Sequence, residues 1–559
     1  MRTRPASGTN ARAPNRAPRR SPNTNARRSP RSHRLVGALI GLLTAGVALG
    51  VAQLAAGFVG GAAAPIVAVG ETVVDATPEW LKNFAIRAFG SNDKLVLLIG
   101  IGVVLGVAAA ALGAVCVRRP MAGVIGLLCL GGLGIIASLT RPAGGVADAI
   151  PSIAATAAGL IAYVGLRSAA GFSPVAWPAP GRRAAGTSSP RARPRAPAPD
   201  SRTGGLDRRR FLLAGVAAAA VAGASSLAGR YLIRRSIAAA SRADVRIPTP
   251  TDIAPLPPRG ANLGIGGLGP FITPNDRFYR VDTALFVPAV DAGDWRLRVH
   301  GMVDRDLTIS YAELLDRPLI ERDITLTCVS NPVGGPYAGN ARWIGARLKD
   351  LLDEAGVRPG ANQIVSRSTD GFTVGTPTAV ALDGRDSMLA VAMNGQPLPL
   401  EHGFPVRMIV PGLYGYVSAT KWIVDIELTT FAAFSAYWVR RGWSQQAPIK
   451  TESRIDTPAS LATVPAGEVP VAGVAWAQHR GIERVEVRVD DGEWMPADLA
   501  AQDTVDTWRQ WVYRWPATRG RHSLSVRATD DTGATQTPVE SDPPPNGATG
   551  DHTIVVTVA

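Results

Sequence analysis

Cysteine is scarce in this sequence, with only three residues, Cys116, Cys129 and Cys328. Cys116 and Cys129 lie inside apolar runs and Cys328 lies in a polar region, so no framework of extracellular disulfides can form. CxxC pairs, haem-attachment motifs and flavin or nicotinamide fingerprints are also missing from the sequence. Cys328 is therefore a lone thiol in the polar half of the chain. By composition alone, such a thiol is a small buried hydrophobic group.

Histidine and acidic residues are missing, or nearly so, from the long apolar runs. All six histidines lie outside these runs, which excludes a bis-histidine haem within them, and the shortage of carboxylates argues against a proton or ion pathway. We predict four transmembrane helices over 35–168 and a fifth within 208–230, which anchor the protein or dock a partner. The runs, each long enough to span a bilayer, cover about 35–56, 94–117, 121–139, 148–166 and 211–228.

Arginine is plentiful but unevenly placed, and it gives the chain a formal net charge of +15. It concentrates in 1–34 and 169–207, which have too few aromatic residues to form a core and are predicted to be disordered. Because arginine favours the cytoplasmic side, we predict a multi-pass protein of the cytoplasmic membrane. Its N-terminus is expected inside and its catalytic half outside. Contact of these arginines with nucleic acid or anionic lipid is the alternative; we expect the lipid membrane as partner and no nucleic acid.

The segment Arg208-Arg209-Arg210-Phe211-Leu212 precedes the fifth apolar run and resembles the twin-arginine export signal. Proteins with this signal cross the membrane already folded, so a cofactor loaded in the cytoplasm is expected. An arginine cluster that only follows the positive-inside rule is the alternative, and the two interpretations are compatible.

A short interfacial helix is predicted between the first two apolar runs. Thr77-Pro78-Glu79 supplies an N-cap, a proline at the first helical position and an acidic first turn. Trp80, Leu81, Phe84 and Ala88 then follow at helical spacing.

A packed domain is predicted after a linker over 231–258, because strands, turns and short helices alternate from there on. A β-branched strand delivers Cys328 to a loop rich in Ser, Asn, Pro and Gly, which places the thiol well for reaching a site. A glycine-rich loop lies between Arg407 and Lys421, and its backbone amides together with these two cations could hold a phosphate-bearing anion.

Taken together and in order, these segments resemble the sulfite oxidase family of molybdopterin enzymes, from about Asn275 to the C-terminus. The motifs that carry the resemblance are Thr273-Pro274-Asn275-Asp276-Arg277-Phe278-Tyr279-Arg280, Ile324-Thr325-Leu326-Thr327-Cys328, Ser368-Thr369-Asp370-Gly371-Phe372, His402-Gly403-Phe404-Pro405-Val406-Arg407 and Pro411-Gly412-Leu413-Tyr414-Gly415-Tyr416 with Lys421-Trp422. The resemblance implies a mixed α+β domain over 259–435 with one molybdenum cofactor per chain, and it makes Cys328 the metal ligand.

The resemblance also implies roles for other residues. Cys328, Arg280 and Asp370 are the expected catalytic groups. The residues expected to hold the cofactor or line its anion pocket are Asn275, Phe278, Arg280, Cys328, Asp370, His402, Arg407, Gly415, Ser418 and Lys421.

Three departures from the family pattern concern the substrate. The loop after Cys328 has Val333 where sulfite oxidases proper have an arginine, which removes a positive charge from the anion pocket. Trp443 follows the Trp438-Val439-Arg440-Arg441 element where a tyrosine is usual, and Asp282 stands where a histidine usually follows the Phe-x-Arg element. Acceptance of sulfite is therefore left open.

The C-terminal segment, 445–559, alternates apolar and polar residues in period two and predicts a seven-strand immunoglobulin-like sandwich. In the family this module makes a dimer interface, so a homodimer is one expectation. A packing module without a role in assembly is the alternative.

The sequence thus predicts oxygen-atom transfer at a Mo-pterin centre, with a small sulfur oxyanion or an S- or N-oxide as substrate. Electrons would pass to or from a separate partner, a haem protein or a quinone-linked one. The first alternative is a membrane-tethered interaction or assembly module in which Cys328 is inert. The second is a hydrolase that uses His402 and Asp370, although no activated Ser or Cys elbow accompanies them.

Overall fold

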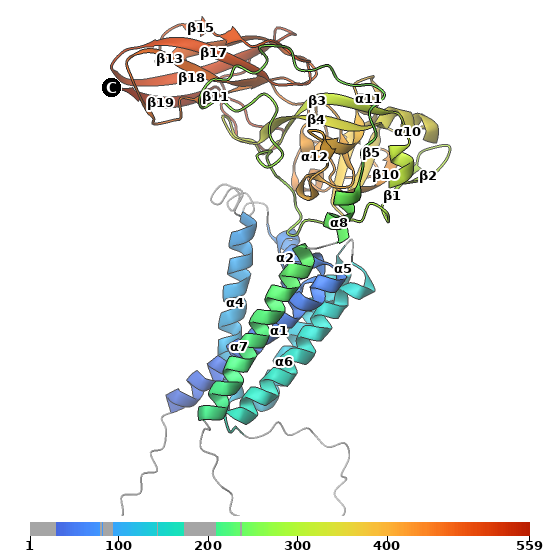
Figure 1. The fold of residues 1–559 in the computed structure, drawn as a ribbon, viewed down its shortest axis with the longest axis vertical. Helices are drawn as coiled ribbons and strands as arrows, with labels where there is room; N and C mark the ends of the chain where they lie inside the picture. Colours follow the sequence, from blue (N-terminus) through green and yellow to red (C-terminus); the bar gives the residue numbers. More distant parts are fainter. Residues whose placement is uncertain (1–29, 79–80, 82–92, 142–143, 173–207, 235–236) are drawn as a thin grey trace, which may run out of the picture.

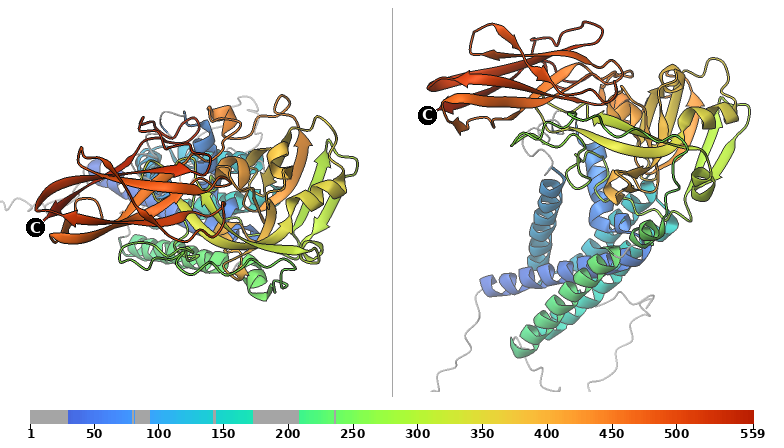
Figure 2. Two further views of the ribbon diagram at one scale, coloured as in Figure 1. Left: turned by 90° about the horizontal axis from the view of Figure 1, so that it is seen from above. Right: turned by 45° about the horizontal axis from the view of Figure 1, so that its top comes forward.

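The computed structural model describes residues 30–78, 81, 93–141, 144–172, 208–234 and 237–559. A helical bundle lies below a mixed α/β domain, and two further β-sheets lie beside that domain (Figures 1 and 2). The predicted interfacial helix lies almost wholly outside the described residues, as do the tail over 1–34 apart from its last residues and nearly all of the linker over 169–207.

Five helices of the bundle are long and apolar enough to cross a membrane, which confirms the five predicted runs as helices. They are α1 Pro30–Val59, α4 Asp93–Cys116, α5 Pro120–Thr140, α6 Ile150–Ala169 and α7 Arg208–Arg234. A further apolar helix, α2 Pro65–Ala76, was not predicted. At 12 residues it is too short to register as a span.

Small residues let the helices of the bundle pack closely. A Cβ atom on Gly41 of α1 would lie 2.0 Å from the backbone oxygen of Ala109 in α4. A Cβ atom on Gly229 of α7 would likewise lie 2.3 Å from the backbone oxygen of Gln53 in α1. Backbone contact between helices of this kind is typical of membrane bundles, where packing replaces the hydrophobic effect.

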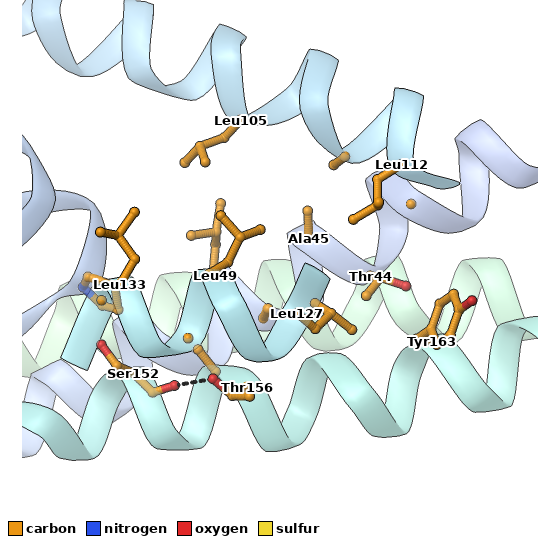
Figure 3. A pocket seen from close by; sticks show the side chains of 18 of the residues that line it. Thr44, Ala45, Leu49, Leu105, Leu112, Leu127, Leu133, Ser152, Thr156 and Tyr163 are labelled. Carbon is orange, nitrogen blue, oxygen red and sulfur yellow. Dashed lines mark hydrogen bonds between the residues drawn. The ribbon is translucent and has the colours of Figure 1, made fainter. Parts of the chain in front are cut away.

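An apolar cavity of about 190 Å³ lies between α1, α4, α5 and α6. Figure 3 shows Leu105 and Leu112 of α4 across the cavity from Leu49 of α1. The Thr156 hydroxyl donates to the Ser152 carbonyl oxygen at 2.7 Å, so this polar group is satisfied within α6. The interior of the bundle is therefore suited to apolar groups rather than ions.

The mixed domain contains two five-stranded sheets, with orders β2-β1-β10-β5-β6 and β3-β4-β7-β8, and β9 pairs with β7. β1 runs parallel to β10 and the other pairs in the first sheet are antiparallel, which confirms the predicted α+β class. Fully buried side chains such as Leu297, Trp343 and Ile364 form its core. The strands are β1 Arg296–Gly301, β2 Leu307–Ser310, β3 Leu319–Thr327, β4 Ala338–Arg347, β5 Gln363–Ser368, β6 Thr373–Pro377, β7 Met388–Met393, β8 Gln396–Pro397, β9 Arg407–Ile409 and β10 Ile423–Thr429. The helices are α9 Tyr311–Leu315, α10 Leu348–Ala355, α11 Thr378–Leu382 and α12 Gly415–Ser418.

The predicted linker contains a helix that docks on the mixed domain, α8 Ile237–Asp244. Arg242 donates from Nε to the Leu398 carbonyl oxygen at 2.7 Å and from Nη2 to the Pro397 carbonyl oxygen at 2.8 Å. On the bundle side, a Cβ atom on Gly61 would lie 2.3 Å from the Phe286 ring. The bundle and the mixed domain are thus in direct contact.

The C-terminal part has one sheet of order β11-β13-β17-β16 and a second of order β12-β19-β18-β14-β15, with an apolar core. The predicted count of seven strands is wrong, because the structure has nine. β12, β15 and β16 contain two or three residues each, too few to give a period-two pattern. The strands are β11 Glu452–Thr457, β12 Thr463–Val464, β13 Gly467–Trp476, β14 Ile482–Val489, β15 Trp494–Pro496, β16 Asp498–Leu499, β17 Arg509–Ala517, β18 Gly520–Asp530 and β19 His552–Val558.

Glu452 should give the fold a distinctive pH dependence. It is 3% exposed, and burial raises its pKa from 4.5 to about 8. The folded chain therefore keeps a proton that the unfolded chain loses, and stability falls as pH rises from 4.5 to 8. At pH 8 the free energy of unfolding of Glu452→Gln is expected to exceed that of the wild type by roughly 2 to 4 kcal/mol, which raises the melting temperature. Near pH 4 the two proteins should be equally stable. Equal melting temperatures of the two proteins in detergent at both pH values would contradict this.

Candidate active site

A cavity of about 120 Å³ collects most of the predicted site residues in the mixed domain. Seven of the ten line it, namely Phe278, Cys328, Asp370, His402, Arg407, Gly415 and Lys421. Asn275, Arg280 and Ser418 are not among the lining residues. The cavity therefore brings together predicted residues that are up to 143 positions apart in the sequence, from Phe278 to Lys421.

Cys328 follows directly after the last residue of β3, as predicted. Its backbone N–H donates to the Tyr337 carbonyl oxygen at 2.9 Å, which fixes the start of the loop. Burial raises the pKa of the thiol, although hydrogen bonds with Ser330 and the charge of Lys421 oppose the shift. A neutral thiol is thus favoured unless a cation binds to the sulfur.

The C-terminal sheets hold the strand that carries Cys328. Gln478 donates from Nε2 to the Thr325 carbonyl oxygen at 3.0 Å and to the Thr327 hydroxyl at 2.9 Å. The Trp508 backbone N–H donates to the Thr325 hydroxyl at 2.8 Å. The position of the thiol thus depends on contacts from both domains.

Removal of the Gln478 amide should weaken this junction. Gln478 is 1% exposed, so Gln478→Leu leaves buried polar groups of β3 without partners. We expect a loss of roughly 1 to 3 kcal/mol in the free energy of unfolding. Thermal unfolding in detergent measures the loss, and Gln446→Leu at an exposed position is the control. Equal melting temperatures for both variants would show that the bonds contribute nothing.

Arg407 is a buried cation at the cavity wall, 6% exposed. Its Nη1 donates to the His402 carbonyl oxygen at 3.2 Å, whereas its Nε has no hydrogen-bond partner in the part of the chain that the structure describes. Burial lowers the pKa to about 10, so the guanidinium is still charged at neutral pH. Its Cζ lies 5.1 Å from the centre of the Trp343 ring. A buried guanidinium with an unused donor is suited to an anion.

His402 is neutral at physiological pH, because burial and the charge of Arg407 lower its pKa to about 4. Its Nε2 lies 3.1 Å from the Asn275 carbonyl oxygen, to which it can donate. Its ring packs edge-on against Phe278 with a centroid distance of 5.5 Å. A histidine held in this way is a weak base, which removes support from the hydrolase alternative.

Lys421 and Arg280 share one carboxylate. Asp282, whose side chain is 4% exposed, lies 2.8 Å from Lys421 Nζ and 2.8 Å from Arg280 Nε. Burial lowers the pKa of Lys421 to about 8, and Asp282 limits the shift. The departure from the usual histidine at position 282 therefore brings a negative charge to the two predicted anion-binding cations.

Asp370 lies at the turn between β5 and β6, where its Oδ1 accepts from the Phe372 backbone N–H at 3.1 Å. Gly371 in that turn has a φ of 84°, a left-handed conformation that favours glycine. The turn directs Asp370 to the cavity.

The side chains of two predicted residues, Asn275 and Ser418, form hydrogen bonds with residues that do not line the cavity. The Asn275 side chain donates to the Met393 carbonyl oxygen at 3.3 Å and accepts from Asn394 at 2.8 Å. The Ser418 hydroxyl donates to the carbonyl oxygens of Leu413 and Tyr414 at 2.9 and 3.1 Å, which holds the turn of α12. Both side chains thus have partners within the protein, and their contact with the cofactor stays a prediction.

An aromatic wall was not predicted as a group. Trp443 lies 5.8 Å from Tyr416 and 6.0 Å from Trp438 between ring centroids, and all three line the cavity. The only signal in the sequence is the departure at Trp443, since rings from separate loops leave no periodic pattern. Tyr279 and Trp422 also line the cavity, next to predicted residues.

A mixed α+β domain that brings one strand-end thiol and a buried arginine to a single cavity is characteristic of a molybdopterin-binding domain. Residues 284–438 match the oxidoreductase molybdopterin binding domain. The chain is 31% identical to human mitochondrial sulfite oxidase over 310 residues, covering 47% of this chain and 56% of that protein. It is 34% identical to the uncharacterized oxidoreductase YuiH of Bacillus subtilis over 153 residues, covering 27% of this chain and 74% of YuiH. Among solved structures, the sulfane dehydrogenase SoxCD from Paracoccus pantotrophus matches with a TM-score of 0.43 at 23% identity, covering 48% of this chain and 74% of that one.

The chain belongs to the sulfite oxidase family of molybdopterin-dependent oxidoreductases. It spans little more than half the length of the human enzyme, 56%.

Proposed function

We propose that this protein is a membrane-anchored molybdenum-cofactor oxidoreductase that transfers oxygen atoms to or from a small sulfur oxyanion or an S- or N-oxide. The observation that carries the proposal is that one cavity is lined by both the Cys328 thiol and the buried Arg407, whose Nε has no hydrogen-bond partner among the described residues. The unused donor of this buried cation suits the phosphate of the cofactor.

The residues of the cavity suit the cofactor by their donor chemistry. The Cys328 sulfur would bind molybdenum as a thiolate, a soft ligand of the type that the metal takes. Arg407 and Lys421 would hold the phosphate, and Arg280 would lie near it, because Arg280 shares Asp282 with Lys421. When bound, the cofactor supplies two-electron oxygen-atom transfer. The catalytic set would be Cys328, Arg280 and Asp370, with Phe278, His402 and Gly415 at the cofactor.

The protein's own groups would orient the substrate and exclude water. Asp370 faces the cavity and can accept a hydrogen bond from a bound substrate or orient a water molecule. Tyr416, Trp438 and Trp443 form an apolar wall, and an indole at position 443 cannot offer the hydroxyl of a tyrosine. Such a wall suits S- and N-oxides as well as sulfur oxyanions, so both substrate classes are included.

The bundle is proposed to cross the cytoplasmic membrane with the catalytic half outside. α1 and α7 begin at the end of the bundle that is far from the mixed domain (Figure 1). The end of α6 lies there beside the end of α4, because Arg167 Nη1 donates to the Cys116 carbonyl oxygen at 2.6 Å. This end carries Arg118, Arg119 and Arg208 to Arg210, so the positive-inside rule supports a cytoplasmic location for it.

The remaining parts of the proposal rest on the sequence. Export through the twin-arginine route follows from Arg208 to Phe211, and the electron partner would be a separate haem protein or a quinone-linked one. The two C-terminal sheets are proposed to form an immunoglobulin-like sandwich, which in a homodimer would lie at the interface.

Metal content tests the proposal directly. Full-length protein from a host that makes the cofactor is expected to contain about one molybdenum and one pterin per chain, measured by elemental mass spectrometry and pterin fluorescence. Reduction of a small S-oxide by dithionite-reduced protein is expected to follow the metal content. Folded protein without molybdenum or pterin would instead favour the alternative, a membrane-tethered interaction module.

A further inference from the structure

A second hollow, which we call the vestibule, lies between the bundle and the mixed domain and has a volume of about 640 Å³. On the bundle side it is lined by Glu71 and Thr72 of α2 and by Arg141 at the end of α5. On the domain side it is lined by Thr283, Asp370 and Phe372. It is therefore built jointly by the two parts of the chain.

The vestibule adjoins the candidate active site. Thr283, Asp370 and Phe372 line both the vestibule and the cavity that contains Cys328. Because side chains from one turn face both hollows, a solute in the vestibule is one side chain away from the cavity. On the side that faces the bundle, the wall of the candidate active site is therefore one side chain thick.

The bundle side of the vestibule is held in place by charged contacts. Arg141 Nε lies 2.6 Å from Glu71 Oε2, and Arg141 Nη1 donates to the Ala62 carbonyl oxygen at 2.7 Å. These bonds tie the end of α5 to α2 and to the turn before it. That turn packs against the mixed domain through Gly61 and Phe286. The bundle side of the vestibule is therefore held in place by the fold.

The charges of the lining favour anions. The lining contains three arginines, Arg141, Arg440 and Arg441, against two carboxylates, Glu71 and Asp370. In a confined space a net positive charge raises the local concentration of anions. The volume of about 640 Å³ admits small solutes, whereas a folded protein cannot enter.

We infer that the substrate reaches the active site through the vestibule, that Thr72 and Arg141 of the bundle wall this route, and that the route selects small anions. That the solute is a substrate rests on the proposed function, whereas the route itself does not depend on it. The bundle is then part of the enzyme's specificity as well as its anchor.

The test uses cofactor-free, full-length protein in detergent with Cys116→Ala and Cys129→Ala, so that Cys328 is the single thiol. The probes are two methanethiosulfonates of similar size, one with an anionic sulfonate and one with a cationic trimethylammonium group. We expect the anionic reagent to label Cys328 about threefold faster or more. Thr72→Trp should slow both reagents about threefold or more, because an indole narrows the vestibule. The control is Val73→Trp, at a 41% exposed neighbour outside the lining, and should leave both rates unchanged.

Thr72→Glu and Thr72→Gln provide a second test that does not depend on bulk. The added carboxylate should slow the anionic reagent and speed the cationic one, each about threefold relative to the neutral glutamine. Unchanged rates in Thr72→Trp and Thr72→Glu would overturn the inference. Labelling requires no molybdenum, so a failure here is distinguishable from a failure of the proposed function, which the metal content decides.

Discussion

Replacing Cys328 with serine is expected to lower turnover of the loaded enzyme at least about 100-fold, because loss of a metal ligand should exceed the loss seen for groups that only orient ligands. A serine hydroxyl is a hard oxygen donor of nearly the same size, so the fold should survive while the metal loses its soft ligand. Activity with an artificial electron acceptor and the visible absorption of the oxidised metal centre measure the two effects.

The other two cysteines give matched controls for this substitution. Cys116 and Cys129 lie in the helical bundle, in α4 and α5, and neither lines the candidate active site. Cys116→Ser and Cys129→Ser should therefore keep both turnover and spectrum. A Cys328→Ser protein with wild-type absorption and full activity would show that the thiol is an inert side chain of the domain.

The sequence was sufficient to predict the place of Cys328 at the end of a strand, because the signals for it are local. A β-branched strand, a single cysteine and a loop of Ser, Asn, Pro and Gly stand next to one another, and the structure ends β3 at Thr327. The five apolar helices are equally local, since length and composition define them. In both cases neighbouring residues carry the information.

The contacts that complete the site are not local, and no pattern could reveal them. Asp282 meets Lys421 across 139 residues, and Gln478 meets Thr327 across 151. The local hydrogen bonds of the Ser418 hydroxyl, to backbone oxygens of its own turn, also left no pattern in the sequence. The vestibule was beyond prediction for the same reason, since it exists only where two domains meet.

Arg407→Met is expected to have opposite effects on the empty and the loaded protein. In the empty protein the guanidinium is 6% exposed, its Nε has no partner, and burial lowers its pKa to about 10. A methionine of similar length removes this unsatisfied charge, so the cofactor-free variant should be as stable as the wild type or more stable, by roughly 1 to 3 kcal/mol. Thermal unfolding of cofactor-free protein measures this difference.

In the loaded protein the same guanidinium would face the cofactor phosphate, and its loss should cost roughly 2 to 4 kcal/mol of binding, a reduction of about 30-fold or more in cofactor retention. Molybdenum per chain after dialysis measures it. Arg298→Met is the matched control, because Arg298 is 56% exposed, is paired with Asp306 and does not line the cavity, so its loss should leave retention unchanged. If Arg407→Met lowered the stability of the empty protein and left cofactor retention intact, Arg407 would be a structural residue, and the phosphate would have to be held by Lys421 alone.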